Sequence, residues 1–191
     1  MKKKRLNLNV VLVEPNGPLN VGSIARLCSN FDVNELRIVS PKCDIFSLEA
    51  KKMALKGHRY IDNCKIFNSI EHAIFDCDLV LATCGRIDLS NDIECESPED
   101  ISKWISSFVE INNLGILFGR EDRGLSNNEL LFAHKILNIK TSQNYPSLNL
   151  SHAVSIILYE LNKSSTNFVE KDLQVFDLAS SKQIYESFKE I

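Results

Sequence analysis

The sequence predicts an α/β fold, in which helices cover both faces of a parallel β-sheet. Two observations support this prediction. Short apolar runs, typical of buried parallel strands, alternate along the chain with segments of helical periodicity. The chain has 191 residues, of which 44% are hydrophobic and 25% charged, and this composition is that of one globular domain with a substantial core.

The first half of the chain predicts three strands, each followed by a helix. Residues 8–13 form a β-rich run that ends at a loop with two prolines and a glycine, which forbid a regular element. Asn20 is a favoured N-cap residue, so we expect a helix from there to about Asn30. The other elements expected here are a strand at 36–39, a helix near 47–56, a strand at 65–67 and a helix at 70–75.

The second half contains the most apolar strand candidates. Residues 78–83 are the strongest candidate for a parallel strand, and residues 114–118 form another apolar run, which Gly119 ends. Ser126 is expected to cap the next helix, with Glu129 completing a capping box. The other elements expected here are a helix around Trp104, a strand at 135–140, a helix at 148–161 and a short amphipathic helix at the end of the tail.

Composition and charge argue against several classes of protein. No apolar run approaches the ~18 residues that a membrane-spanning helix needs, and the basic start has no signal-peptide core, so we expect a cytoplasmic protein without membrane contact. The six cysteines lack a Cys-x-x-Cys pair and the four histidines lack ligand spacing, which argues against a metal site and a disulfide framework. We expect most thiols to be reduced and at least partly buried. The net charge of -3 does not indicate nucleic-acid binding, although locally convergent lysines and arginines can still meet phosphates.

The most informative segment is 118–126, a loop between an apolar strand and a capped helix. It contains two glycines, two arginines and two acids. In open α/β sheets, ligands bind at the carboxyl ends of strands, and loop glycines let backbone amides approach a ligand closely. The strand end at 83–86 is expected at the same edge. The alternative interpretation is a solvated turn with surface ion pairs.

A second segment, 20–26, stands where a loop leads into a helix. Helical spacing puts Gly22, Ala25 and Arg26 close to one side, so small residues surround the base of a cationic side chain. This side could receive a ligand or another chain. Alternatively, it packs tightly against a neighbouring helix while Arg26 is solvated.

The third segment, 145–151, turns from a polar loop into an apolar helix that Ser147 or Asn149 could cap. Taken in order, the three segments resemble the three motifs of the SpoU/TrmH class of the SPOUT methyltransferases, and they look most like the TrmJ-type branch. The resemblance runs from near the start of the chain to about Leu161. Any one motif is a weak signal, whereas three in the family's order are a specific one.

The resemblance implies a fold and an assembly that pattern reading cannot supply. Members of this class have an α/β knot fold, a parallel sheet whose C-terminal part is tied in a deep trefoil knot. They are homodimers that bind S-adenosylmethionine in the knot, with the active site at the subunit interface and no metal. We therefore expect a methyltransferase domain at 1–162 and a short C-terminal tail with a helix at 163–191.

The resemblance also implies the residues of the site. The expected cofactor-binding residues are Thr83, Cys84, Gly85, Gly119, Glu121, Ile139, Ser147, Leu148 and Asn149. The expected catalytic residues are Arg26, Asn20, Glu121, Ser147 and Asn149, of which Asn20 and Arg26 face the acceptor ribose. The family assigns activation of the ribose hydroxyl to the first-motif arginine, here Arg26. Because a free guanidinium is a poor base, Arg26 either becomes transiently basic in the dimer or orients the ribose and its phosphate while another group takes the proton.

The function implied is methyl transfer from S-adenosylmethionine to a ribose 2′-oxygen of RNA. TrmJ-type enzymes modify cytidine or uridine at nucleotide 32 in the tRNA anticodon loop, where an unpaired base can be splayed out, so tRNA is the expected partner and DNA is not. The tail after Leu161 is shorter than the extension of the bacterial TrmJ-type enzymes, so ribosomal RNA or another tRNA position is an alternative target. A second alternative is an RNA- or cofactor-binding module without catalysis. A dehydrogenase is not expected, because no Gly-x-Gly-x-x-Gly follows the first strand.

Overall fold

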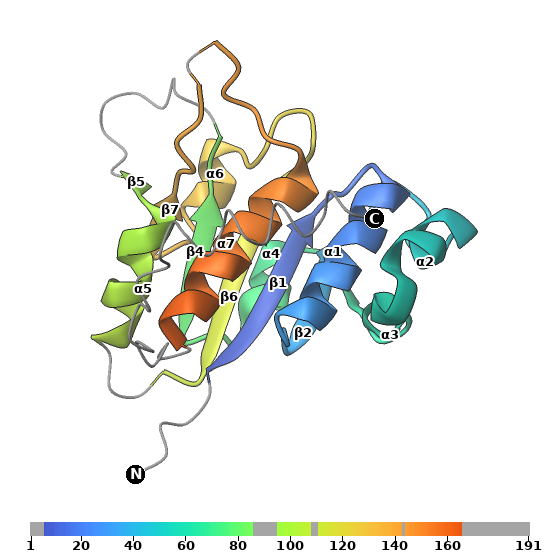
Figure 1. Ribbon diagram of the computed structural model, residues 1–191, viewed down its shortest axis with the longest axis horizontal. Coiled ribbons are helices and arrows are strands. Elements are labelled where there is room, and N and C mark those ends of the chain that lie inside the picture. Colours follow the sequence, from blue (N-terminus) through green and yellow to red (C-terminus); the bar gives the residue numbers. More distant parts are fainter. Residues whose placement is uncertain (1–5, 86–94, 108–110, 143, 166–191) are drawn as a thin grey trace, which may run out of the picture.

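The structure is a computed structural model that describes residues 6–85, 95–107, 111–142 and 144–165 (Figure 1). The basic start at 2–5, Arg86 and the helix expected in the tail lie outside these residues. The strands are β1 (Asn7–Val13), β2 (Glu35–Val39), β3 (Lys65–Phe67), β4 (Leu79–Thr83), β5 (Cys95–Glu96), β6 (Asn113–Phe118) and β7 (Lys135–Leu137). Within the described part of the chain they form one seven-stranded sheet in the order β3-β2-β1-β6-β4-β7-β5, and each neighbouring pair is parallel.

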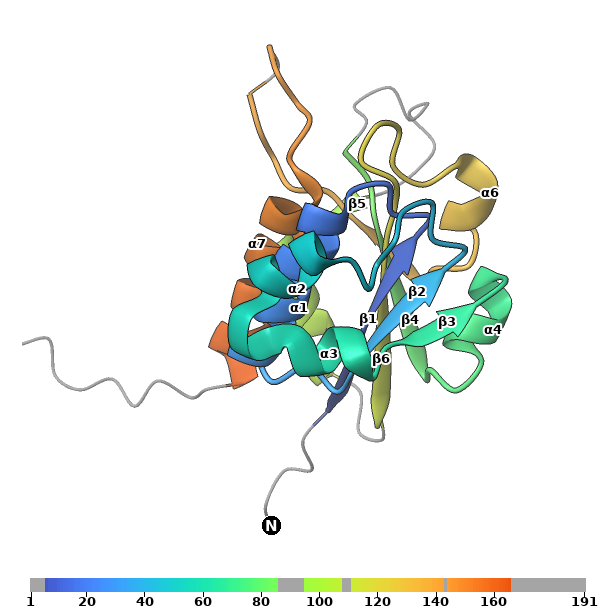
Figure 2. The same cartoon turned by 90° about the vertical axis from the view of Figure 1, so that its right-hand side faces the viewer.

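Helices cover both faces of this sheet, which confirms the predicted α/β class. They are α1 (Pro18–Asn30), α2 (Leu48–Ala54), α3 (His58–Asp62), α4 (Ile70–Ile74), α5 (Pro98–Ser106), α6 (Asn127–Leu130) and α7 (Leu150–Ser165), with a 3-10 helix η1 (Leu55–Gly57) between α2 and α3. Figure 2 shows α1, α2, α3 and α7 on one face, and α4 and α6 on the other. Helix α5 joins the first group, because Ile101 belongs to the same core cluster as the buried residues of α1 and α7.

The central strand β1 explains why the two layers are stable. Its side chains alternate between the faces: Val10 and Leu12 pack under α1 and α7, whereas Val11 and Val13 pack under α4 and α6. All four are 0 to 2% exposed. A strand that is buried on both faces must be apolar throughout, and this is why the run stood out in the sequence.

Two expected helices begin or end at other residues than predicted. The first helix begins at Pro18 rather than at Asn20, which lies inside the first turn and does not cap it. Proline is favoured at the first helical position because its fixed φ suits the helix and its missing N–H needs no partner there. The helix expected near 47–56 ends at Ala54, because Leu55 adopts a left-handed φ of 49° and turns the chain into η1 and α3.

Other differences concern short elements. The capping box of Ser126 and Glu129 is confirmed, but its helix α6 ends at Leu130 because the chain must turn into β7 only a few residues later. Strand β7 ends at Leu137 rather than near 140, and α7 begins at Leu150 rather than at 148. Strand β5 was missed, since two residues within a polar connection carry no periodic signal.

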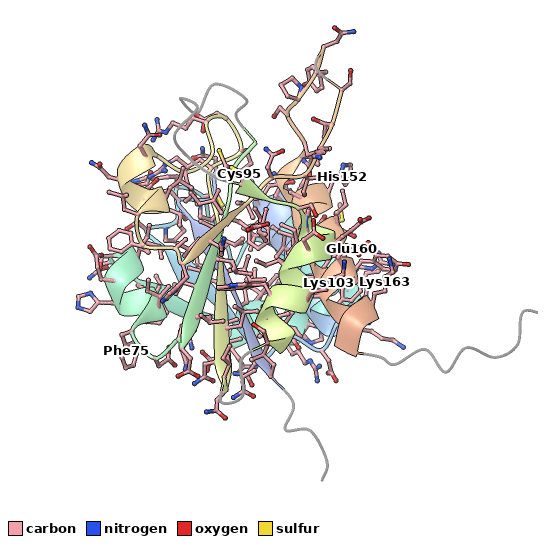
Figure 3. All side chains as sticks on the ribbon, turned by 90° about the vertical axis from the view of Figure 1, so that its left-hand side faces the viewer. Phe75, Cys95, Lys103, His152, Glu160 and Lys163 are labelled. Carbon is pink, nitrogen blue, oxygen red and sulfur yellow. The ribbon has the colours of Figure 1, made fainter. Side chains whose placement is uncertain are left out.

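Most of the cysteines are buried or half-buried, as expected. None of the six forms a disulfide, and only Cys95, at the edge of the sheet on β5, is exposed (Figure 3). Burial raises the pKa of the Cys64 and Cys77 thiols, which keeps them in the neutral form. Because the strands are parallel, their carboxyl ends meet at one edge, at the top of Figure 1, and the loops of all three sequence motifs leave or enter there.

Candidate active site

A cavity of about 900 Å³ opens at the carboxyl edge of β4, β6 and β7. Four segments line it, and each follows a strand or leads into α7. The lining residues are 83–85, 118–125, Leu137, Ile139, 146–148, Leu150 and Ala153. Leu125, Leu137 and Leu150 are buried and give the cavity an apolar wall. Loops at the carboxyl ends of parallel strands are the usual place for a ligand in such sheets.

The cavity brings together most of the residues that the sequence singled out for a cofactor. The expected residues that line it are Thr83, Cys84, Gly85, Gly119, Glu121, Ile139, Ser147 and Leu148. Asn149 lies next to this lining but is not part of it, and neither Asn20 nor Arg26 lines the cavity. Arg120, Arg123 and Pro146 also contribute to its wall; they belong to the motif segments but were not expected to bind the cofactor.

A second cavity, of about 540 Å³, lies at the opposite edge of the sheet. Its wall comes from the amino ends of β1 and β2 and from α3, with residues such as Asn7, Asn34 and Arg59. None of the three sequence motifs reaches it. The first cavity is therefore the better candidate for a functional site.

Arg120 fixes the shape of the loop after β6. Its side chain is 11% exposed, and its Nη1 and Nη2 donate to both carboxylate oxygens of Glu129 at 2.9 Å, while its Nε donates to Glu14 Oε2 at 2.6 Å. The hydrogen bonds from Arg120 hold the pKa of Glu129 at about 2 and also lower the pKa of Glu14. The two carboxylates in turn raise the pKa of Arg120. This arginine is a structural clamp. The alternative interpretation of the loop as a solvated turn with surface ion pairs is correct about the ion pair but wrong about its exposure.

The register of the sheet explains why Arg120 meets Glu14. Leu12 on β1 is paired with Phe118 on β6, so the residues two positions further along each strand lie opposite one another. Glu129 was already recognised in the capping box, where its Oε2 accepts from the backbone N–H of Ser126 at 2.7 Å. The only sequence signal for the clamp was an arginine nine residues before that glutamate.

Gly119 is required by the loop itself rather than by a ligand. A Cβ atom at this position would collide with the carbonyl carbon of Gly124 and the backbone nitrogen of Leu125. Gly124 closes the turn with a φ of 67°, and its backbone N–H donates to the carbonyl of Arg120 at 2.9 Å. By contrast, a Cβ at Gly85 would meet no atom of the described residues within 4 Å, so among these residues Gly85 borders open space in the cavity.

Hydrogen bonds connect the three sequence motifs. Glu121 accepts from the backbone N–H of Asn16 at 2.9 Å and of Gly17 at 3.0 Å, and from Asn20 Nδ2 at 3.1 Å. Asn20 Oδ1 in turn accepts from Asn149 Nδ2 at 3.0 Å. Asn20 is thus a bridge between the loop after β6 and the start of α7. Glu121 places a carboxylate at the N-terminus of α1, where negative charge is favourable.

Asn149 also has a local role. Its Oδ1 accepts from the backbone N–H of Ser151 at 2.9 Å and from the Ser151 hydroxyl at 2.7 Å, which is the arrangement of a helix N-cap. The capping interpretation is therefore correct for Asn149, and its amide nitrogen remains available for Asn20. Ser147 is exposed at the mouth of the cavity.

Arg26 lies on the outer surface of α1. The side of α1 that carries small residues packs against α2 of the same chain, because a Cβ at Gly22 would stand only 2.8 Å from Met53 Cβ. The tight-packing interpretation is thus correct for Gly22. The side chain of Arg26 is exposed. Within one chain, Arg26 therefore does not reach the cavity.

The cavity provides an apolar wall and glycine-containing loops, which suits a ligand that combines an aromatic ring with polar ends. Among the described residues, no cluster of three or more His, Cys, Asp or Glu side chains could hold a metal ion. No described helix is long and apolar enough to cross a membrane.

Comparison with known proteins gives a consistent result. A family model described as the SpoU rRNA Methylase family matches residues 7–159. The chain is 37% identical over 186 residues to the tRNA (cytidine-2′-O-)-methyltransferase TrmJ of Methanocaldococcus jannaschii, which covers 96% of this chain and 80% of that protein.

Two solved structures show the same fold. The crystal structure of TrmJ from Z. mobilis is similar with a TM-score of 0.75 and 30% identity, over 83% of this chain and 70% of that one. The SpoU methyltransferase AviRb from Streptomyces viridochromogenes, in complex with the cofactor AdoMet, has a TM-score of 0.66 at 18% identity, over 85% of this chain and 60% of that one. At that identity, the likeness to AviRb concerns the fold alone.

Proposed function

The chain belongs to the SpoU rRNA methylase family, and we propose that it transfers a methyl group from S-adenosylmethionine to a ribose 2′-oxygen of tRNA. One observation carries the proposal. The three motifs, which are far apart in the sequence, are joined through the Asn149–Asn20–Glu121 hydrogen bonds at the mouth of one cavity. A binding module without catalysis could have the same fold, but it would not need polar side chains from all three motifs to converge.

The residues of the cavity fit S-adenosylmethionine. The volume of about 900 Å³ is large enough for a nucleoside cofactor. Ile139, Leu148 and the buried leucines provide apolar surface for an adenine ring, and the glycine-containing loops at 83–85 and 118–125 present backbone groups for its polar ends. When bound, this cofactor supplies a methyl group on a positively charged sulfur. The trefoil knot expected from the family is part of this proposal.

We further propose that two copies of the chain form the active site. Arg26 does not line the cavity of its own chain, so a second copy must bring it to the cofactor. Helices α1 and α7, which pack side by side, carry exposed apolar side chains at Leu19, Ile156 and Tyr159. Burial of these side chains against their counterparts would stabilise a homodimer with Arg26 near the interface.

The residues have separate tasks in the proposed reaction. Asn20 and Glu121 hold the start of α1 against the cofactor loop, and Asn149 holds the start of α7, so that the reacting groups are aligned; alignment alone can contribute several kcal/mol, on the order of 7 or more. Arg26 orients the ribose and the adjacent phosphate. Ser147, exposed beside Asn149, is placed to contact the nucleotide.

The substrate is proposed from the relatives. The Methanocaldococcus protein is named as a cytidine-2′-O-methyltransferase of tRNA, and we propose the same substrate class here, with a pyrimidine at nucleotide 32 as the first target to examine. An unpaired anticodon loop exposes the 2′-hydroxyl that an enzyme of this kind needs. We propose a cytoplasmic location, which agrees with a tRNA substrate.

The test is transfer of a labelled methyl group from S-adenosylmethionine to unmodified tRNA, followed by mapping of the modified ribose, with Arg26→Ala as the matched variant. We expect a 2′-O-methyl group in the anticodon loop that is absent with the variant, while the affinity for the cofactor is unchanged. Transfer to ribosomal RNA instead would change the substrate. Cofactor binding without transfer to either RNA would favour the binding module, and an Arg26→Ala variant with the parent rate would remove Arg26 from the mechanism.

A further inference from the structure

The cations of the described chain fall into two groups. Most lysines and arginines lie within 4 Å of a carboxylate, including the buried Arg37 and Arg120 and the exposed Lys51 and Lys103. The described cations without an ion pair are Arg26, Lys52, Lys56, Arg59 and Lys140. Because the chain has a net charge of -3, it has enough acidic residues to pair with these five cations as well. The positions of the five cations therefore carry information about a binding partner.

Four of these five cations lie on α1, α2, η1 and α3, which pack against one another on one face of the sheet. Lys52 lies near the end of α2, Lys56 on η1 and Arg59 on α3, and all three are exposed. A Cβ at Gly57 would stand 2.7 Å from the Cα of Arg26, so η1 lies directly on α1 at this arginine. Figure 2 shows α1, α2 and α3 on the same face of the sheet.

Local contacts keep this surface positive. Lys51 is neutralised by Asp62 at 3.2 Å and does not count toward it. Glu49 lies about one turn before Lys52 on α2, but the two form no ion pair within 4 Å. Arg59 stands over the ring of Tyr60, with 5.1 Å from its guanidinium carbon to the ring centre, and this contact adds no negative charge to the surface.

We propose that Lys52, Lys56 and Arg59 form a track that binds RNA phosphates and continues from Arg26. The proposal rests on the proposed function and extends it, because it assigns the surface that holds the RNA outside the reacting nucleotide. Unpaired, solvated cations bind phosphates with release of counterions and without reading sequence. Continuity with Arg26 favours RNA as the occupant, since the track then leads toward the ribose that Arg26 orients.

The test is RNA binding by the full chain with Lys52→Gln, Lys56→Gln and Arg59→Gln combined. The matched control combines Lys65→Gln, Lys103→Gln and Lys163→Gln, which changes the net charge equally but removes cations that are already ion-paired. Lys103 and Lys163 lie on α5 and α7, which carry none of the track residues (Figure 3). The probes are an unmodified tRNA and an unrelated RNA of equal length, each measured between about 50 and 200 mM KCl.

We expect the track variant to bind both RNAs at least about tenfold more weakly, with a slope of log Kd against log salt that is smaller by about 2 to 3. The control variant keeps the slope of the parent. Both variants keep the parent's affinity for S-adenosylmethionine, which excludes a loss through misfolding.

Three results would overturn the track. In the first, the track variant binds RNA with the same affinity and the same salt dependence as the parent. In the second, the track variant and the control variant lose RNA affinity equally. In the third, the parent chain binds neither RNA. Exposed Leu48 and Leu55 lie near these cations, so vesicles of equal parts phosphatidylcholine and phosphatidylserine are tested as well. Loss of vesicle binding with unchanged RNA binding would assign the surface to a membrane instead. If the parent chain binds RNA through the track but transfers no methyl group, the proposed function is wrong and the track still stands.

Discussion

The clamp between Arg120 and Glu129 predicts a pH-dependent contribution to stability. The Glu129 side chain is 18% exposed, and the hydrogen bonds from Arg120 lower its pKa from 4.5 to about 2. A difference of this size between the folded and unfolded states corresponds to roughly 3 kcal/mol. Because the folded pKa is the lower one, this stabilisation is complete above pH 4.5 and is lost as the pH falls toward 2. Glu129→Gln keeps the shape of the side chain and removes its charge.

We therefore expect Glu129→Gln to lower the free energy of unfolding by about 2 to 3 kcal/mol near pH 7, and the gap between parent and variant to shrink below pH 4.5. Urea unfolding followed by the fluorescence of Trp104, at several pH values from neutral to about 3.5, measures this gap. Glu49→Gln is the control, since it removes an exposed carboxylate outside the clamp. A gap that stays constant with pH, or that is absent at neutral pH, would refute the reasoning.

Three further predictions concern the cavity and its neighbours. Gly85→Leu fills open space in the cavity, so it should weaken S-adenosylmethionine binding at least about tenfold in calorimetry without lowering the melting temperature. Gly119→Ala should lower the melting temperature, because its Cβ collides with the loop. Equal losses of melting temperature in both variants would contradict this assignment. Asn20→Ala removes hydrogen bonds to Glu121 and Asn149 and should cost about 1 to 2 kcal/mol of stability, with a larger loss in the single-turnover methyl-transfer rate; an unchanged rate would separate the bridge from catalysis. Leu55→Gly should stabilise the chain by up to about 1 kcal/mol in urea unfolding, because Leu55 is half exposed at a φ of 49°, and a destabilised variant would show that its packing outweighs the backbone strain.

Local interactions account for what the sequence predicted well. The capping box at Ser126 was correct because its partner is three residues away, and most strands were found because a strand buried on both faces has to be apolar. The start of the first helix was placed wrongly because Asn20 was expected to cap it, whereas the helix begins at Pro18 and Asn20 donates to Glu121, 101 residues further along the chain. No local pattern around Asn20 announces that partner.

The sequence by itself determined the α/β class, the three motifs and the edge of the sheet at which their loops meet. Only the tertiary structure decided that Arg120 is a clamp, that Gly119 serves its own loop, that Asn20 bridges two motifs and that Arg26 does not line the cavity of its own chain. The reason is physical. Caps and periodic burial depend on neighbours within one or two turns, whereas these contacts arise because the strand order places β6 beside β1, which sets Glu14 opposite Arg120.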